Sequence, residues 1–413
     1  MSTHVHAAPV GRKFFTPGVS LLIVLAAIAG GLAVYRFIFG LSSITNLSDR
    51  YPWGLWIAVD VATGVALAAG GFTTAALTHI FHRGRYLPVV RPALLTAMLG
   101  YTFVGLGLMV DLGRYYNIWH PAWPTMWQGN SVLFEVGMCV MAYLTVLYLE
   151  FLPIICEWSR HGGRLRGPLA LVQRPFKRFL EVAERMLDKT MSVLIIAGVV
   201  LSCMHQSSLG ALMLIAPYKV HPLWYTPILP LLFLLSAIAV GYPMVIFESM
   251  VSAMSFRRKP EMEILAPLSR LALLFLGIYM AAKVIDLMVR NVYGHLFDGD
   301  LASNMFLVEL GLGVLLPFCM LLSSRIRRSP RWLFLANLLI VLGVALNRIN
   351  VYIIAYQPQY ATQRYVPSVS EVLVTVGLIA TLMLVFRIFV TIFPVLPAVE
   401  QKTAPAGGRR IEG

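Results

Sequence analysis

Side chains that can exchange protons or bind anions interrupt several long apolar stretches of this sequence. They are Asp60, Asp111, Arg114, Glu135, His205 and Gln206. Ionisable groups within apolar stretches of membrane length are costly and mark functional sites by default. Hydroxyl groups lie nearby in the sequence at Tyr101, Ser207 and Ser208, and Tyr115 directly follows Arg114. We therefore expect these residues to carry proton-transfer chemistry beside an apolar cleft.

This combination of groups suits the reduction or oxidation of a quinone. The ring carbonyls need hydrogen-bond donors, the isoprenoid tail needs an apolar cleft, and two protons move with two electrons. A carboxylate or imidazole of altered proton affinity can relay those protons. We expect Glu135 and Asp60 to be proton relays and His205 to donate to a quinone carbonyl. The expected binding residues are Tyr101, Asp111, Arg114, Tyr115, Gln206, Ser207 and Ser208.

Plainer explanations exist for several of these residues. Aromatic side chains near the ends of apolar stretches commonly form an interfacial belt. Asp111 and Arg114 could be an ion pair at a helix end, and His205 could be a core residue with satisfied hydrogen bonds. Asp60 and Glu135 are harder to explain as structural groups.

A second polar set lies nearer the opposite ends of the apolar stretches. Its members are His79, Glu150 and Glu248, with Thr73, Thr74 and Thr78. They could line a proton route, or they could simply reach water at the membrane surface.

The elements that hold these residues are predicted to be transmembrane helices. Hydrophobic residues make up 58% of the 413 residues and charged residues only 13%, whereas soluble chains carry about 25% charged residues. Runs of about 20 apolar residues are long enough to cross a bilayer as helices. An all-α integral membrane protein with ten spans is expected, at about 19–39, 54–82, 92–111, 130–156, 191–213, 227–252, 267–289, 302–324, 332–352 and 369–394. We expect the first of these to be an uncleaved helix and not a signal peptide.

Basic residues alternate in density along the chain. Of the 33 lysines and arginines, most follow even-numbered spans or lie in the two terminal tails. The positive-inside rule then places both termini in the cytoplasm, and the expected location is the inner (cytoplasmic) membrane. The formal charge of +14 is therefore a topology signal, and no nucleic-acid partner is implied. The longest polar segment, 157–190, is predicted to be a cytoplasmic loop, either an amphipathic helix on the membrane surface or a solvated linker.

Similar residues recur at a nearly constant offset. Asp111 and Asp286 are 175 positions apart, and Glu135 and Glu309 are 174 apart. This spacing predicts two parallel four-helix units within one polytopic domain, the first over 54–213 and the second over 227–352. Chance is the alternative, because acidic residues are common at helix ends.

No redox centre is evident in the sequence. The histidines do not supply a pair facing each other at one membrane depth, which a bis-histidine haem requires. The four cysteines lack the spacing of zinc or iron–sulfur ligands. We therefore expect no metal site, no haem and no iron–sulfur cluster, so that electrons come from a partner.

Six motifs resemble the membrane subunit of the NrfD / polysulfide-reductase family. They are YPWGLWIAVD (51–60), VRPALL (90–95), DLGRY (111–115), NSVLFE (130–135), MHQSS (204–208) and YKVHPLW (218–224). The resemblance is strongest to the branch of the nickel–iron hydrogenase "cytochrome b" subunit HybB, and it covers nearly the whole chain.

The resemblance implies a quinone-reactive subunit without haem, using menaquinone or ubiquinone. It implies a periplasmic ferredoxin-like iron–sulfur partner on the outer face, and a catalytic subunit of hydrogenase, molybdopterin or multihaem cytochrome type. Proton translocation is suspected for some members. The family's essential glutamate matches Glu135, its aspartate matches Asp60, and its quinone pocket matches His205 and its neighbours. The alternatives are a secondary transporter, which should show interrupted helices at matching positions in both halves, and a passive membrane anchor of a complex.

Overall fold

The computed structural model describes residues 7–397 except 12, 165, 166, 360 and 362. Within this part, regular structure is helical, and β-pairing is limited to isolated bridges. Ten of the described helices are long and apolar enough to cross a membrane: Pro17–Phe39, Trp56–Ile80, Gly84–Asp111, Val132–Arg160, Lys189–Leu214, Leu229–Ser255, Met262–Val289, Leu301–Leu322, Pro330–Ile354 and Val369–Ile392. The predicted all-α architecture with ten spans is confirmed.

Three spans are interrupted by π-helical turns. The second combines Trp56–Thr63 (π), α2 (Gly64–Leu67), α3 (Ala69–Ala75) and Ala76–Ile80 (π). The eighth combines α9 (Leu301–Leu310), Gly311–Leu315 (π) and α10 (Leu316–Leu322), and the ninth combines α12 (Pro330–Ile349) and Asn350–Ile354 (π). Such turns widen a helix locally and are frequent at functional sites. The π turns contain or adjoin ionisable residues of the spans, among them Asp60, His79, Glu309 and Arg348.

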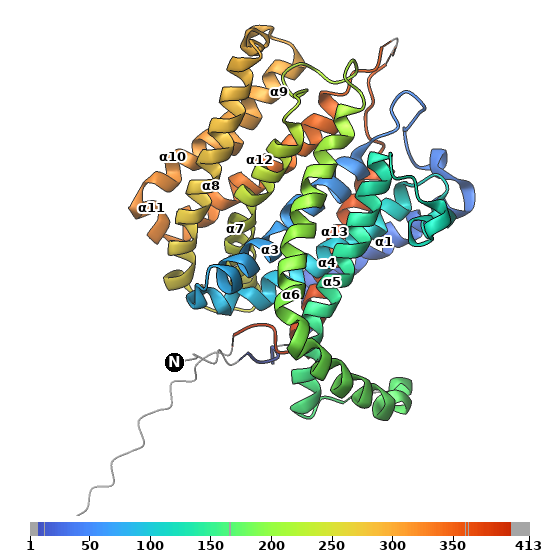
Figure 1. The fold of residues 1–413 in the computed structure, drawn as a ribbon, viewed down its shortest axis with the longest axis vertical. Coiled ribbons are helices and arrows are strands. Elements are labelled where there is room, and N and C mark those ends of the chain that lie inside the picture. Colours follow the sequence, from blue (N-terminus) through green and yellow to red (C-terminus); the bar gives the residue numbers. More distant parts are fainter. Residues whose placement is uncertain (1–6, 12, 165–166, 360, 362, 398–413) are drawn as a thin grey trace, which may run out of the picture.

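The second and sixth spans form the centre of the bundle. Their hydrophobic windows are 78% and 67% buried, against 11% for the first span. The sixth span is α7 (Leu229–Ser255), which packs against α3, α6 (Gln173–Leu214), α8 (Met262–Val289) and α12 (Figure 1). Polar groups on the buried faces of these central helices are therefore enclosed by protein.

The first and last spans pack against each other at the edge of the bundle. Gly377 of α13 (Val369–Ile392) lies directly against Ala29 of α1 (Pro17–Phe39), where a larger residue would not fit. Both helices also pack on α4 (Leu87–Asp111). The described terminal segments meet as well, because the Ala8 amide donates to the Leu396 carbonyl at 3.0 Å.

The predicted loop 157–190 is largely helical. α5 (Val132–Arg160) and α6 both extend past the apolar spans, and α6 runs without interruption for 42 residues. The extensions contact each other through Arg160 and Glu184, whose charged atoms are 3.1 Å apart. The periodic segment is thus helical and continues directly into the fifth span. Its expected place on the membrane surface stays a prediction. Figure 1 shows it projecting beyond one end of the bundle.

Candidate functional site

Glu135 lies on the first turn of α5, where the Ser131 hydroxyl caps the helix by accepting from the Phe134 amide at 3.3 Å. A carboxylate is favoured there by the helix dipole. Ser208 of α6 donates its hydroxyl to the Glu135 carboxylate at 2.5 Å. The side chain of Glu135 is otherwise exposed at the surface of the chain. One carboxylate oxygen is thus held by a hydroxyl and the other is open to exchange.

His205 lies one turn before Ser208 on α6 and is fully buried. Its Nδ1 is 3.1 Å from the hydroxyl of Tyr101, which is also fully buried and packs edge-to-face on Tyr143. Its Nε2 has no partner among the described residues. Buried polar atoms are nearly always hydrogen-bonded, so this nitrogen is suited to hold a polar ligand or a water.

Gln206 and Ser207 complete this stretch of α6. The Gln206 amide donates to the Val65 carbonyl at 2.8 Å, while its buried Oε1 has no partner in the described structure. Ser207 is half-buried. Together with His205, Gln206 provides a second unpaired buried polar atom on the same helical turn.

Asp60 lies on the π-helical turn of the second span and is half-buried. Thr375 of α13 donates to its carboxylate at 2.6 Å. Gly107 of α4 packs against it so closely that an added Cβ would lie 2.9 Å from the Asp60 Cβ. The contacts of Asp60 therefore come from the third and tenth spans, whereas the hydrogen-bond partner of Glu135 comes from the fifth span.

Asp111, Arg114 and Tyr115 lie where α4 ends. Arg114 is exposed and forms no ion pair with Asp111 in the described structure. The nearby cation is Arg36 of α1, a buried residue that donates to the Leu112 carbonyl and lies 5.0 Å from the centre of the Tyr115 ring. Arg36 also interacts electrostatically with Asp111. The proposed ion pair between Asp111 and Arg114 is thus not formed.

The corresponding pair in the second half is formed. Arg290 binds Asp286 through two nitrogens, at 2.6 and 3.0 Å, and also donates to two loop carbonyls. Thr226 donates to the same carboxylate at 2.6 Å. An ion pair at a helix end therefore explains Asp286 and Arg290, whereas Asp111 and Arg114 do not form such a pair with each other in the described structure.

The structure brings the predicted site residues together in separate contact groups. Glu135 pairs with Ser208, His205 pairs with Tyr101, and Asp60 pairs with Thr375. Asp60 and Glu135 share no hydrogen-bond partner among the described residues. A single pocket lined by both carboxylates stays a prediction.

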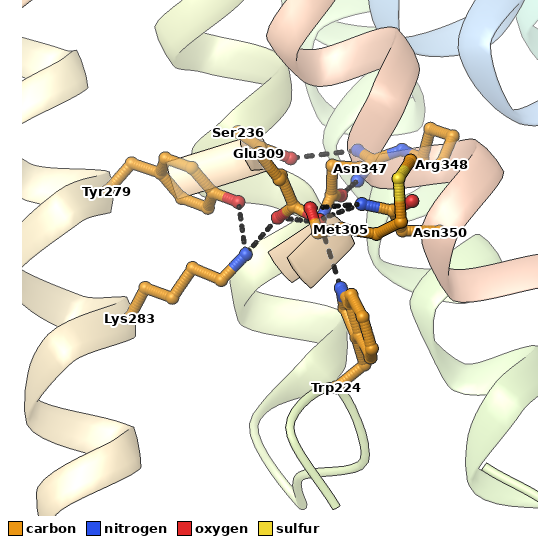
Figure 2. A network of polar contacts seen from close by, with 9 residues as sticks. All are labelled: Trp224, Ser236, Tyr279, Lys283, Met305, Glu309, Asn347, Arg348 and Asn350. Carbon is orange, nitrogen blue, oxygen red and sulfur yellow. Dashed lines mark hydrogen bonds and ion pairs between the residues drawn. The ribbon is translucent and has the colours of Figure 1, made fainter. Parts of the chain in front are cut away.

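A buried polar network in the second half was not predicted as a site (Figure 2). Glu309 of α9 is 1% exposed and accepts from Lys283 of α8. It also accepts from Asn347 and Asn350, each at 2.8 Å, and from the Trp224 indole at 3.0 Å. Both carboxylate oxygens are therefore fully occupied by donors from four different side chains.

Arg348 extends this network on the far side of Asn347. It donates to the Asn347 side chain at 2.6 Å and to the Ser236 hydroxyl at 2.8 Å (Figure 2). Its guanidinium also lies 3.7 Å from the centre of the Phe233 ring. One feature of the sequence pointed to Glu309, namely its 174-residue offset from Glu135. The two glutamates at this offset differ sharply: Glu309 is enclosed and paired, and Glu135 is exposed with one hydroxyl partner.

The second predicted polar set is also dispersed. The hydroxyls of Thr73, Thr74 and Thr78 donate to carbonyls of their own helix, and His79 is exposed. Glu248 lines a cavity of about 70 Å³ between α4 and α7, and one of its buried oxygens has no partner in the described structure.

Glu261 lines the same cavity, where burial raises the pKa of its carboxyl group and the charge of Arg258 lowers it. The predicted proton route is not tested by these contacts.

The fold and these buried ionisable groups define a multi-pass integral membrane protein with polar sites between its helices. Residues 43–361 match the family described as "Polysulphide reductase, NrfD". The chain belongs to this family, as the sequence motifs predicted.

Individual relatives cover nearly the full chain. It is 36% identical over 398 residues to the "Probable Ni/Fe-hydrogenase 2 b-type cytochrome subunit" of Escherichia coli (strain K12), which spans 95% of this chain and 96% of that protein. It is 26% identical to the "Menaquinone reductase, integral membrane subunit" of Nitratidesulfovibrio vulgaris, over 89% of each chain. It is 24% identical to a selenate reductase subunit of Mesobacillus selenatarsenatis, over 89% of this chain and 92% of that protein. The relatives are thus membrane subunits of oxidoreductases, consistent with a redox-related role.

The name of the first relative includes a b-type cytochrome. In the described structure the buried His205 faces Tyr101, and no group of three or more histidine, cysteine or acidic side chains could hold a metal ion. The absence of haem stays a prediction.

Proposed function

We propose that this chain is the quinone-reactive membrane subunit of a respiratory oxidoreductase complex of the inner membrane. It exchanges electrons between an iron–sulfur partner docked on the outer face and menaquinone or ubiquinone. The observation that carries this proposal is the contrast between Glu135 and Glu309. Only Glu135 is exposed and retains an unpaired carboxylate oxygen, so of these two glutamates only Glu135 can exchange protons with a ligand or with water.

The residues around Glu135 supply the groups that quinone reduction requires. The reaction adds two electrons and two protons to the quinone, and the electrons come from the partner. The Ser208 hydroxyl orients the Glu135 carboxylate, which holds or releases a proton at its free oxygen. His205, with Tyr101 behind it, presents Nε2 as a hydrogen-bond donor or proton carrier. Asp60, held by Thr375, is proposed as a second relay.

The names of the relatives support the redox assignment. One is named as part of a hydrogenase, one of a menaquinone reductase and one of a selenate reductase. In line with these names, the electrons are proposed to come from an iron–sulfur subunit and, through it, from a catalytic subunit. Proton translocation coupled to this transfer is part of the same proposal.

The test is a quinone assay on the intact complex. The complex is purified from membranes, and quinol formation is measured with candidate electron donors. A photoreactive quinone analogue is then cross-linked and its attachment site is mapped by peptide mass spectrometry. The expected result is quinol formation, with label on α5 or α6 near Glu135. The assignment would be refuted, in favour of a passive anchor, if a redox-active complex formed no quinol or if the label were confined to helices away from Glu135. Uptake of a solute without electron transfer would instead favour a transporter.

A further inference from the structure

Five arginines line a groove at the basic ends of the second, third, seventh and eighth spans. They are Arg83, Arg85, Arg270, Arg327 and Arg328. The groove consists of two hollows of about 470 and 490 Å³. The hollows adjoin, because Arg85, Pro267 and Arg270 line both of them. We call this feature the arginine groove.

The positive charge of the arginine groove is largely unneutralised. Among the described residues, Glu263 is the only acidic one that lines either hollow. Arg85 donates to the backbone carbonyl of Glu263 at 2.5 Å, and Arg327 donates to two carbonyls at the end of α10. Arg83, Arg270 and Arg328 form no hydrogen bond or ion pair in the described structure, and both Arg83 and Arg270 are exposed. Guanidinium groups in this arrangement are suited to bind phosphate through paired N–H donors.

Apolar side chains also line the arginine groove, between the arginines. Leu77, Leu271 and Met262 line the hollows beside the arginines. Large apolar side chains next to them in the chain are exposed, including Phe81 (66%) and Leu274 (54%). α11 (Ser324–Arg328), which carries two of the arginines, lies at the outer edge of the bundle beside α8 (Figure 1). A ligand with phosphates and acyl chains would match both kinds of surface.

We propose that the arginine groove binds the headgroup of an anionic phospholipid, and specifically of a diphosphatidylglycerol. Basic pockets between transmembrane helices at the membrane surface bind such headgroups. Two adjoining hollows that share Arg85 and Arg270 fit a headgroup with two phosphates, and the apolar side chains beside the arginines favour a lipid over a soluble phosphate. The site is separate from Glu135 and does not depend on the proposed quinone chemistry.

The test is native mass spectrometry of the purified full-length chain in detergent. The chain is titrated with diphosphatidylglycerol, with a single-phosphate anionic lipid, with a zwitterionic lipid and with inorganic phosphate. The test variant is Arg83→Gln/Arg270→Gln/Arg328→Gln. The matched control, Arg174→Gln/Arg178→Gln/Arg185→Gln, removes the same charge from the exposed extension of α6.

We expect one tightly held diphosphatidylglycerol on the wild-type chain and on the control. Binding to the test variant should be about 100-fold weaker, because each arginine near the surface contributes about 1 kcal/mol to anionic lipid binding. The three arginines of the test variant make no internal bonds in the described structure, so its unfolding temperature without lipid should match the wild type. If it does not, single Arg→Gln variants replace it, each with about fivefold weaker binding expected. Equal losses in test and control variants, or displacement of the lipid by millimolar phosphate, would overturn the proposal.

Discussion

Removing the Lys283 ammonium group tests whether the network around Glu309 is structural. The side chains of Lys283 and Glu309 are 6% and 1% exposed, so neither charge can be solvated alone. In Lys283→Met the carboxylate keeps three donors, from Trp224, Asn347 and Asn350, but loses its counter-charge. Breaking a buried ion pair from one side costs about 3–5 kcal/mol of unfolding free energy. Glu309→Gln strands the ammonium group and should cost a similar amount.

The double variant Lys283→Met/Glu309→Gln removes both charges together. It should lose only about 1–2 kcal/mol, because neutral replacement of a buried pair is often tolerated. The losses of unfolding free energy in the two single variants would then sum to several kcal/mol more than the loss in the double variant. This difference is the coupling energy of the pair, and it would be strong for two residues in contact. The measurement is equilibrium unfolding of the purified chain in mixed detergent micelles.

Glu135→Gln is the matched control for this series, because it makes the same chemical change at an exposed glutamate, 174 positions before Glu309. Its unfolding free energy should change by less than about 1 kcal/mol, since exposed groups with one hydrogen bond contribute little. Additive losses in the Lys283 and Glu309 cycle, or an equal loss in Glu135→Gln, would refute the structural interpretation of the network.

Two further predictions concern helix packing and capping. Asp300 caps α9 by accepting from the Ser303 amide at 2.7 Å, and this hydrogen bond lowers the pKa of the Asp300 carboxyl; Asp300→Ala should cost about 1 kcal/mol at neutral pH. The carboxyl group of Asp300 has a lower pKa in the folded chain than in the unfolded chain, so its stabilisation is present above the ordinary pKa and is lost as the pH falls through the folded value. The unfolding curves of the wild type and Asp300→Ala should therefore converge in acid. A difference in unfolding free energy that persists or grows there would contradict the cap. Gly313→Ala should cost about 1–3 kcal/mol of unfolding free energy by overpacking, because the added Cβ would lie 2.5 Å from the Gly343 Cα. The control Gly105→Ala should leave stability unchanged, because its added Cβ meets no atom within 4 Å. Equal unfolding midpoints for both variants would show that the contact between Gly313 and Gly343 can relax.

The transmembrane architecture was predictable because a bilayer imposes a simple length rule. Each apolar run is long enough to cross as a helix, and the observed helices match the ten predicted ranges closely. The continuity of α6 was not predicted. Its first half is polar and its second half is apolar, so the two halves were read as separate segments, although the backbone forms one helix. The grouping into two four-helix units and the cytoplasmic orientation stay predictions.

The candidate site was only partly predictable. Carboxylates and a histidine within the spans are recognisable from their apolar sequence context, and the pairing of Glu135 with Ser208 is consistent with that expectation. The partners of Glu309 come from segments as far as 85 residues away, so no local pattern reports that they converge. Arg36 and Arg348 look like ordinary basic residues at helix ends, yet both are buried against aromatic rings. The sequence reveals the charge of such groups but not the neighbours that neutralise or enclose them.

Quinone-coupled turnover of the Glu135→Gln variant in the intact complex decides whether Glu135 is a proton relay. Turnover is compared at equal chain content with wild type and with Glu181→Gln, which changes an exposed glutamate on the extension of α6. Glu135→Gln is expected to assemble normally and to lose at least about 100-fold in turnover, the range of a proton-transfer group, while Glu181→Gln retains wild-type turnover. Wild-type turnover in assembled Glu135→Gln would contradict the assignment of Glu135 as a proton relay.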